Sequence, residues 1–164
     1  MELKRRRFDF RKIVTICYVV AFVIYLIVGL QPAEARQYTI SGNLEIPSIE
    51  LVSDVTTLEL AEHKLDTPDT IVGSYSRNTN KTLLIGHSTT VFVNLNDVVA
   101  GDVIYYNNNK YIVSKVELFQ KADINMSRLL QSEEQETIVI MTCAGQILDN
   151  HDATHRLIVT ALKG

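Results

Sequence analysis

The stretch Val103–Phe119, VIYYNNNKYIVSKVELF, carries the strongest fold signal in the chain. Two strand-like runs, Val103–Tyr106 and Lys110–Phe119, flank three consecutive asparagines at positions 107–109. Asparagine tolerates the left-handed backbone conformations that tight turns between antiparallel strands require. The stretch therefore predicts a β-hairpin.

Further short runs on both sides of this hairpin predict more strands. Leu44–Leu51 alternates apolar and polar residues, and Pro47 within it indicates an edge or bulged strand. The other expected strands are Thr82–His87, Thr137–Cys143 and Arg156–Leu162. About six closely spaced strands predict a mostly antiparallel barrel or sandwich.

Helical signals are weaker. Thr57–Lys64 and Ile124–Leu130 each predict a helix of about two turns, the second with Asp123 as its N-cap.

The N-terminal region has the composition of a membrane segment. Ile13–Leu30, IVTICYVVAFVIYLIVGL, is uncharged and apolar, at the lower limit of the roughly 17 to 25 residues that span a bilayer as a helix. Six basic residues precede it, whereas only Arg36 follows closely, so the positive-inside bias places the N-terminus in the cytoplasm and the rest of the chain outside. The basic residues are Lys4, Arg5, Arg6, Arg7, Arg11 and Lys12.

A cleaved signal peptide is the alternative, because Ala33-Glu34-Ala35 has the small-x-small form of a cleavage site. The apolar run is longer than the roughly 7 to 15 residues of a signal h-region, which favours an uncleaved anchor. We therefore expect a basic cytoplasmic N-terminus (1–12), a transmembrane helix (13–30), a linker (31–43) and one outer domain (44–164).

The charge distribution excludes one class of partner. The whole chain has a formal net charge of -3, but the basic residues are concentrated in the first 36 positions, which leaves the remainder acidic. Binding of nucleic acid depends on neutralising phosphates with Lys and Arg. We therefore expect no nucleic-acid partner for the outer domain.

Cys143 is the only cysteine beyond the N-terminal apolar segment; Cys17 lies within that segment and is expected to be inert. An unpaired thiol in an exported domain indicates either intermolecular pairing or a cysteine kept for its reactivity. Burial as a small hydrophobe is an equally open interpretation from composition alone.

Several motifs taken together resemble the sortases, membrane-anchored cysteine transpeptidases of Gram-positive-type cell surfaces. They are Ile140-Met141-Thr142-Cys143, Gly86-His87, Phe92-x-x-Leu95 followed by Gly101-Asp102-x-Ile104, and Arg156-Leu157-Ile158-Val159. The family motif resembles Thr-Leu-x-Thr-Cys, whereas Val139 stands here in place of its first Thr, a change that packing inside the barrel should tolerate. The resemblance implies a closed antiparallel or mixed β-barrel with a few short helices.

The chemistry expected of these residues follows from their side chains. Only the thiolate attacks an amide, and a free cysteine with a pKa of about 8.5 is mostly protonated at neutral pH, so a positive group is needed nearby. Arg156 is the candidate for stabilising the oxyanion, because a guanidinium never loses its charge. His87 is the candidate general acid, since an imidazolium can protonate a departing amine. Thr142 is a candidate substrate-binding residue.

The resemblance implies cleavage between Thr and Gly of an LPxTG-like sorting signal and transfer of the acyl group to an amine of a cell-wall precursor or a pilin lysine. No cofactor is expected; some relatives of the family bind calcium through loop carboxylates, and calcium stays an open alternative that no motif of this chain supports. The spacing of Asp149, His151, Asp152 and His155 fits no structural zinc pattern, so no metal site is predicted. A membrane-tethered, non-catalytic β domain and a hydrolytic cysteine peptidase are the alternatives.

Overall fold

The computed structural model describes residues 10–29, 38–61, 64–65, 67–78, 80–148 and 152–164. The chain divides into two units, at residues 1–37 and 38–164. In the first unit, helix α1 (Phe10–Gly29) includes all of the predicted membrane segment except Leu30, which lies outside the described residues together with the candidate cleavage site at 33–35. Within the described ranges, no helix is both long and apolar enough to cross a membrane.

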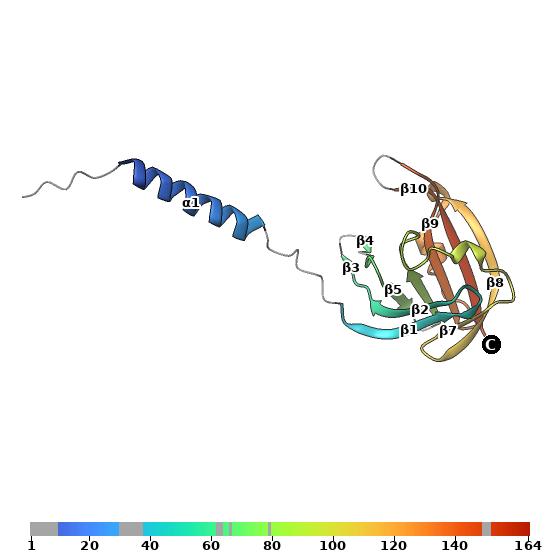
Figure 1. Cartoon of the computed structure of the whole chain (residues 1–164). Coiled ribbons are helices and arrows are strands. Elements are labelled where there is room, and N and C mark those ends of the chain that lie inside the picture. The colour runs from blue at the N-terminus through green and yellow to red at the C-terminus, as the bar shows by residue number, and fades with distance from the viewer. Residues whose placement is uncertain (1–9, 30–37, 62–63, 66, 79, 149–151) are drawn as a thin grey trace, which may run out of the picture. The chain divides into compact units, whose positions relative to one another are not determined.

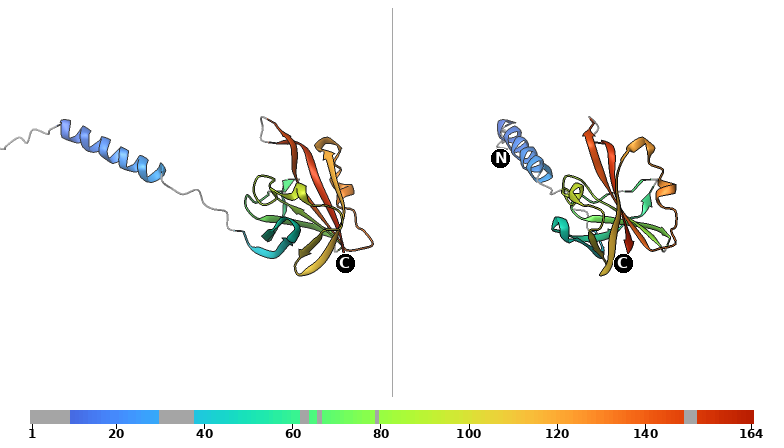
Figure 2. Two further views of the ribbon diagram at one scale, coloured as in Figure 1. Left: turned by 45° about the vertical axis from the view of Figure 1, so that its right-hand side comes forward. Right: turned by 90° about the vertical axis from the view of Figure 1, so that its right-hand side faces the viewer.

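The second unit is a closed eight-stranded barrel (Figures 1 and 2). The strands follow one another round the wall in the order β1-β2-β5-β6-β9-β10-β8-β7. The pairs β2–β5 and β6–β9 are parallel and the other pairs are antiparallel, so the barrel is mixed. The predicted mostly β fold with a closed barrel is confirmed, and the sandwich alternative is wrong. The barrel strands are β1 (Ile40–Ile46), β2 (Leu51–Thr57), β5 (Val72–Asn78), β6 (Lys81–Ile85), β7 (Val103–Tyr106), β8 (Asn109–Gln120), β9 (Thr137–Ile147) and β10 (Ala153–Lys163).

The asparagine turn behaves as its sequence predicts. Asn107 and Asn108 both have positive φ angles, of 50° and 62°, as a two-residue type I′ turn requires. They join β7 to β8, whose register pairs Tyr106 with Asn109. The hairpin prediction is therefore confirmed.

The first half of strand β9 is buried on both of its faces. Ile138 and Ile140 point into the main core inside the barrel. Val139 alternates to the other face and, with Leu83 and Ile158, forms a second buried cluster, which we call the outer cluster. The expectation that Val139 packs inside the barrel is therefore wrong, although its side chain is buried. Side chains around the short helix α2 (Met126–Leu129) cover this cluster, and they include Leu129 and Leu130. The outer cluster therefore provides packed apolar side chains on this face of the sheet, next to the last residues of β9.

Two of the predicted elements differ from the structure at the N-terminal side of the barrel. Leu44–Leu51 is not one strand: β1 ends at Ile46, a 3₁₀ turn, η1 (Pro47–Ile49), follows, and β2 starts at Leu51. Proline fits the first turn of a helix because its missing N–H needs no partner there. Glu50 then takes a left-handed conformation with φ 53°, which turns the chain back.

The predicted helix at Thr57–Lys64 is wrong. Strand β2 runs to Thr57, and the short strands β3 (Leu60–Ala61) and β4 (Lys64–Leu65) pair with each other; residues 62 and 63 lie outside the described residues. The N–H of Leu58 donates to the carbonyl of Ser74 at 2.7 Å, so pairing with β5 extends past the end of β2. Tertiary hydrogen bonds therefore override the local helical pattern.

The helix predicted at Ile124–Leu130 exists but is shorter, and its cap was wrongly placed. The cap is Asn125, whose Oδ1 accepts the N–H of Arg128 at 3.1 Å. Asp123 instead ends a separate 3₁₀ turn, η3 (Lys121–Asp123). A third 3₁₀ turn, η2 (Leu95–Asp97), lies between β6 and β7.

Candidate active site

Strands β9 and β10 place a thiol and a guanidinium on the same surface. Arg156 pairs directly with Cys143 in the antiparallel register of these strands. Side chains that lie directly opposite across antiparallel strands project from the same face, with Cβ atoms about 4.5 to 5.5 Å apart. Cys143 follows Val139 and Met141 at two-residue intervals, so this is the face of the outer cluster.

The imidazole arrives from the neighbouring strand. Strand β6 runs parallel to β9 and pairs Ile85 with Met141 at its last position, so His87 is level with Cys143 just beyond the end of β6. A hydrogen bond fixes this arrangement, because Thr142 Oγ1 donates to the carbonyl of Gly86 at 2.8 Å. The Thr142 side chain is buried, and its hydroxyl therefore ties the histidine segment to the cysteine strand.

Gly86 also holds the histidine segment through close packing. A Cβ atom at this position would lie 2.5 Å from Val91 and 2.8 Å from Phe92. The loop that contains these residues folds back on His87, whose carbonyl accepts the N–H of Thr90 at 3.3 Å and that of Phe92 at 3.0 Å. Only glycine fits at this position without displacing the side chains of Val91 and Phe92 or the segment beside the imidazole.

A pocket of about 710 Å³ brings the predicted site residues together. His87, Thr142, Cys143 and Arg156 all line it. Cys143 is a free, half-buried cysteine at its surface, so the thiol is not sealed in the core. Many of the other lining residues are apolar, namely Leu60, Leu65, Ile85, Met126, Leu130 and Met141. Thr67, Tyr75, Arg77 and Ser127 add polar groups to the wall, among them a second guanidinium.

Arg156 is held by several partners. Its side chain is only 14% exposed. Nη1 donates to the carbonyls of Ala153 at 3.0 Å and His155 at 2.8 Å, and Nη2 donates to Asp152 Oδ1 at 2.7 Å. Lys121 forms an ion pair with the other carboxylate oxygen of Asp152. Hydrogen bonds from Lys121 and then Arg156 hold the pKa of the Asp152 carboxyl well below its usual range.

The imidazole of His87 is more open to solvent. Its side chain is 43% exposed, and Nε2 lies 3.8 Å from Oδ1 of Asp69, which is itself almost fully exposed. Solvent screens such a pair, so it contributes little to stability. The ring remains accessible to a molecule in the pocket.

His155 lies on the opposite face of β10 from Arg156, as strand alternation predicts. Its Nδ1 is 2.8 Å from Thr154 Oγ1, and a Cβ added to Gly145 would lie 2.6 Å from the same nitrogen. Two of the residues weighed as metal ligands, Asp149 and His151, lie outside the described residues.

Sequence reasoning did not find the ionic partners of Arg156 or the contribution of α2 to the pocket. Lys121 is far from Arg156 along the chain, and only the pairing of β8 with β10 brings them near each other. Met126 and Leu130 gave a helical signal but no indication of what that helix covers. The one local signal was the four-residue spacing of Asp152 and Arg156.

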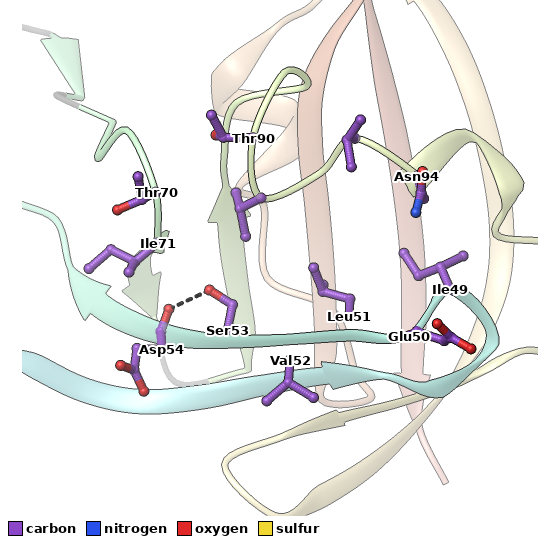
Figure 3. A pocket seen from close by; sticks show the side chains of 12 residues that line it. Ile49, Glu50, Leu51, Val52, Ser53, Asp54, Thr70, Ile71, Thr90 and Asn94 are labelled. Atoms are coloured by element: carbon purple, nitrogen blue, oxygen red, sulfur yellow. Dashed lines mark hydrogen bonds between the residues drawn. The ribbon is translucent and has the colours of Figure 1, made fainter.

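A second pocket, of about 490 Å³, lies between β2 and the loop that contains Thr90 and Asn94 (Figure 3). Figure 3 shows Ser53 and Asp54 on one side of it and Thr90 on another. Among the described residues that line it, none is a cysteine or a histidine. The pocket at Cys143 is therefore the candidate active site.

Comparisons with known proteins agree with this fold. Residues 44–163 match the family profile described as the Sortase domain. Sortase A from Corynebacterium diphtheriae has 22% identity and a TM-score of 0.62, and the alignment covers 78% of this chain but only 62% of that one. Sortase C-1 from Actinomyces oris has 22% identity and a TM-score of 0.58 over 76% of this chain and 73% of that one.

A third similar structure is sortase C from Clostridium perfringens, described as containing the C-terminal cell wall sorting motif. It has 18% identity and a TM-score of 0.58 over 80% of this chain and 74% of that one. No curated protein matches the chain. Because the family profile extends over most of the sequence and the barrel has the same fold, the chain belongs to the sortase family.

Proposed function

We propose that this chain is a cysteine transpeptidase that uses Cys143, His87 and Arg156. The observation that carries the proposal is their arrangement: Arg156 lies directly across from Cys143 in the sheet, and both line one pocket with His87. The pocket is apolar apart from these groups and a few other polar side chains, which suits an extended peptide with small or apolar side chains.

In the first step, the Cys143 thiolate attacks the scissile carbonyl carbon, and the carbonyl oxygen becomes an oxyanion. A guanidinium has five N–H donors, and three of those of Arg156 are donated to Asp152, Ala153 and His155. Nε–H and one Nη2–H take no part in these three hydrogen bonds. We assign these donors to the oxyanion, since donors fixed before the reaction stabilise developing charge most effectively.

In the second step, the C–N bond breaks and a thioester forms on Cys143. The departing amine takes a proton from the imidazolium of His87, which becomes neutral. The exposed ring suits this role because the leaving segment can pass out to solvent beside it. An incoming amine then gives a proton to His87, attacks the thioester and releases the thiolate.

The proposed substrates are surface proteins with an LPxTG-like C-terminal signal, and the proposed acceptor is an amine of a cell-wall precursor or a pilin lysine. The sorting-motif structure of the Clostridium perfringens sortase C supports this substrate class. We further propose that the apolar segment Ile13–Leu30 anchors the chain as a single-pass protein with its N-terminus in the cytoplasm, on the strength of its sequence and the basic residues before it.

The test uses the full chain in detergent micelles with an LPxTG-like peptide, with and without an added amine. We expect cleavage after Thr and a new amide when the amine is present, and both should be lost in Cys143→Ala. Release of the free acid alone, even at high amine concentration, would identify a hydrolase instead. Cleavage by Cys143→Ala at the unmodified rate would refute the assignment of the nucleophile.

A further inference from the structure

Asp152 links two cations at the edge of the candidate active site. It immediately precedes β10, and its Oδ1 accepts both the N–H of Ala153 at 2.8 Å and Nη2 of Arg156 at 2.7 Å. Its Oδ2 accepts Nζ of Lys121, which begins η3 after β8. The carboxylate is therefore held by backbone and by two side chains from different parts of the barrel.

This contact fixes one side of the guanidinium. Nη1 is occupied by two backbone carbonyls, and Asp152 takes one hydrogen of Nη2. The Arg156 side chain is mostly buried, so few of its rotamers remain open. These hydrogen bonds leave Nε–H and one Nη2–H for a group bound in the pocket, which Arg156 lines together with Cys143.

The second cation has an electrostatic consequence. A carboxylate alone beside Arg156 would cancel much of the positive charge that an oxyanion needs. Asp152 also forms an ion pair with Lys121, so Arg156, Lys121 and Asp152 together have a net charge of +1. Lys121 is half-exposed, whereas Arg156 is nearly buried, and the field of the buried cation is screened less by solvent.

We propose that Asp152, balanced by Lys121, is a positioning residue that orients the guanidinium of Arg156 toward the oxyanion formed at Cys143. This inference rests on the proposed transpeptidase function. Asp152 touches neither substrate nor thiol in this scheme and acts only through Arg156.

The test compares Asp152→Ala, Asp152→Asn and Lys121→Met in the full chain, with kcat and KM measured for peptide cleavage. Asp152→Ala should lower kcat by about 10- to 100-fold, while KM changes by less than about threefold, because orientation matters most in the transition state. Asp152→Asn keeps an acceptor oxygen for Arg156 and should therefore lower kcat less than Asp152→Ala does. Lys121→Met should lower kcat several-fold, and it should have no effect when combined with Asp152→Ala.

A double-mutant cycle separates positioning from a general structural role. In an Arg156→Ala background, Asp152→Ala should produce no further loss of residual activity. An equal loss in both backgrounds, or an unchanged kcat, would overturn the inference. If Asp152→Ala fails to fold, Asp152→Asn and Lys121→Met in the same cycle supply the answer.

The matched control is Lys163→Met, which removes another ion pair of β10, 2.6 Å from Nζ to Glu136 Oε2. Lys163 is seven residues from Arg156, or roughly 23 Å along a strand, so kcat should not change. Formation of an acyl-enzyme by the unmodified protein is measured alongside. If it forms and Asp152→Ala has normal kcat, only this inference fails; if it does not form, the proposed function itself fails.

Discussion

Thr142 contributes to the site through a single hydrogen bond. It precedes the candidate nucleophile by one residue, so its side chain points to the other face of β9, where it is buried and donates to the carbonyl of Gly86. Its place in the sequence motif suggested contact with substrate, which stays a prediction. The geometry favours a second role, the alignment of the histidine segment with the cysteine strand.

Thr142→Val tests this second role, because valine keeps the shape but not the hydroxyl. The buried carbonyl of Gly86 would lose its partner, at a cost of about 1 to 3 kcal/mol in the free energy of unfolding. We expect kcat to fall as well, since His87 would no longer be held level with Cys143. Thr142→Ser, which keeps the donor, is the control; equal stability and activity in both variants would contradict this account.

Gly86→Ala should disturb the same segment by adding a methyl group, whereas Thr142→Val removes a hydrogen bond. The added methyl would overlap Val91 and Phe92, and forcing an extra carbon into a packed site costs about 1 to 3 kcal/mol. The backbone that carries His87 should shift, so we expect cleavage activity to fall more than stability alone explains. Gly164→Ala is the control, because a Cβ there makes only ordinary contacts, the nearest at 3.5 Å. Denaturant unfolding and peptide cleavage provide the two readouts.

At the scale of elements, ionic contacts near the end of β10 link three segments of the barrel. Glu136, just before β9, accepts hydrogen bonds from Lys163 of β10 and Tyr111 of β8. The bond from Lys163, followed by that from Tyr111, lowers the pKa of Glu136 below its ordinary value of 4.5. Burial, and then the carboxylate, raise the pKa of Tyr111.

The sign of the pH effect follows from the lowered pKa of Glu136. A carboxyl whose pKa is lower in the folded protein stabilises it above the unfolded pKa, and this contribution disappears as the pH falls through the folded pKa. Urea unfolding of the full chain should therefore show stability declining below about pH 4.5. Lys163→Met should make this decline shallower. An unchanged pH profile in that variant would show that the ion pair does not contribute to the free energy of unfolding.

The elements show why some features could be predicted from sequence and others not. The β7–β8 hairpin was predictable because its turn is encoded locally by Asn107 and Asn108. Strand β5 was not predicted because the two buried residues that follow Val72, Gly73 and Ser74, are not large apolar residues, so the stretch shows no alternation of apolar and polar residues. The helix expected at Thr57–Lys64 does not form, because the N–H of Leu58 donates to the carbonyl of Ser74 in β5. No local sequence pattern reveals this contact.

The candidate site divides in the same way. His87, Cys143 and Arg156 were chosen by their chemistry and by a family resemblance, and the barrel brings all three to one pocket. Their positions along the chain alone did not show how close the three side chains lie in space. The partners that orient Arg156 were out of reach, because Lys121 and Asp152 meet only through the closure of β8 against β10.

At the scale of the whole molecule, the two units have different compositions. The first contains the apolar segment Ile13–Leu30, preceded by basic residues, and the second is an acidic barrel with a pocket at one strand end. We propose that the first holds the second at a membrane surface, where the proposed peptide and amine substrates would both be present. Such confinement would raise the effective concentration of both substrates at the pocket.

The most direct test of the account is to trap the acyl-enzyme. The full chain in detergent is incubated with an LPxTG-like peptide without amine and quenched in acid, and the adduct is mapped by mass spectrometry. We predict a thioester on Cys143 that forms rapidly, disappears when an amine is added, and accumulates at least about 100-fold more slowly in Arg156→Ala. An adduct on any other residue, or none while the peptide is still cleaved, would contradict the account.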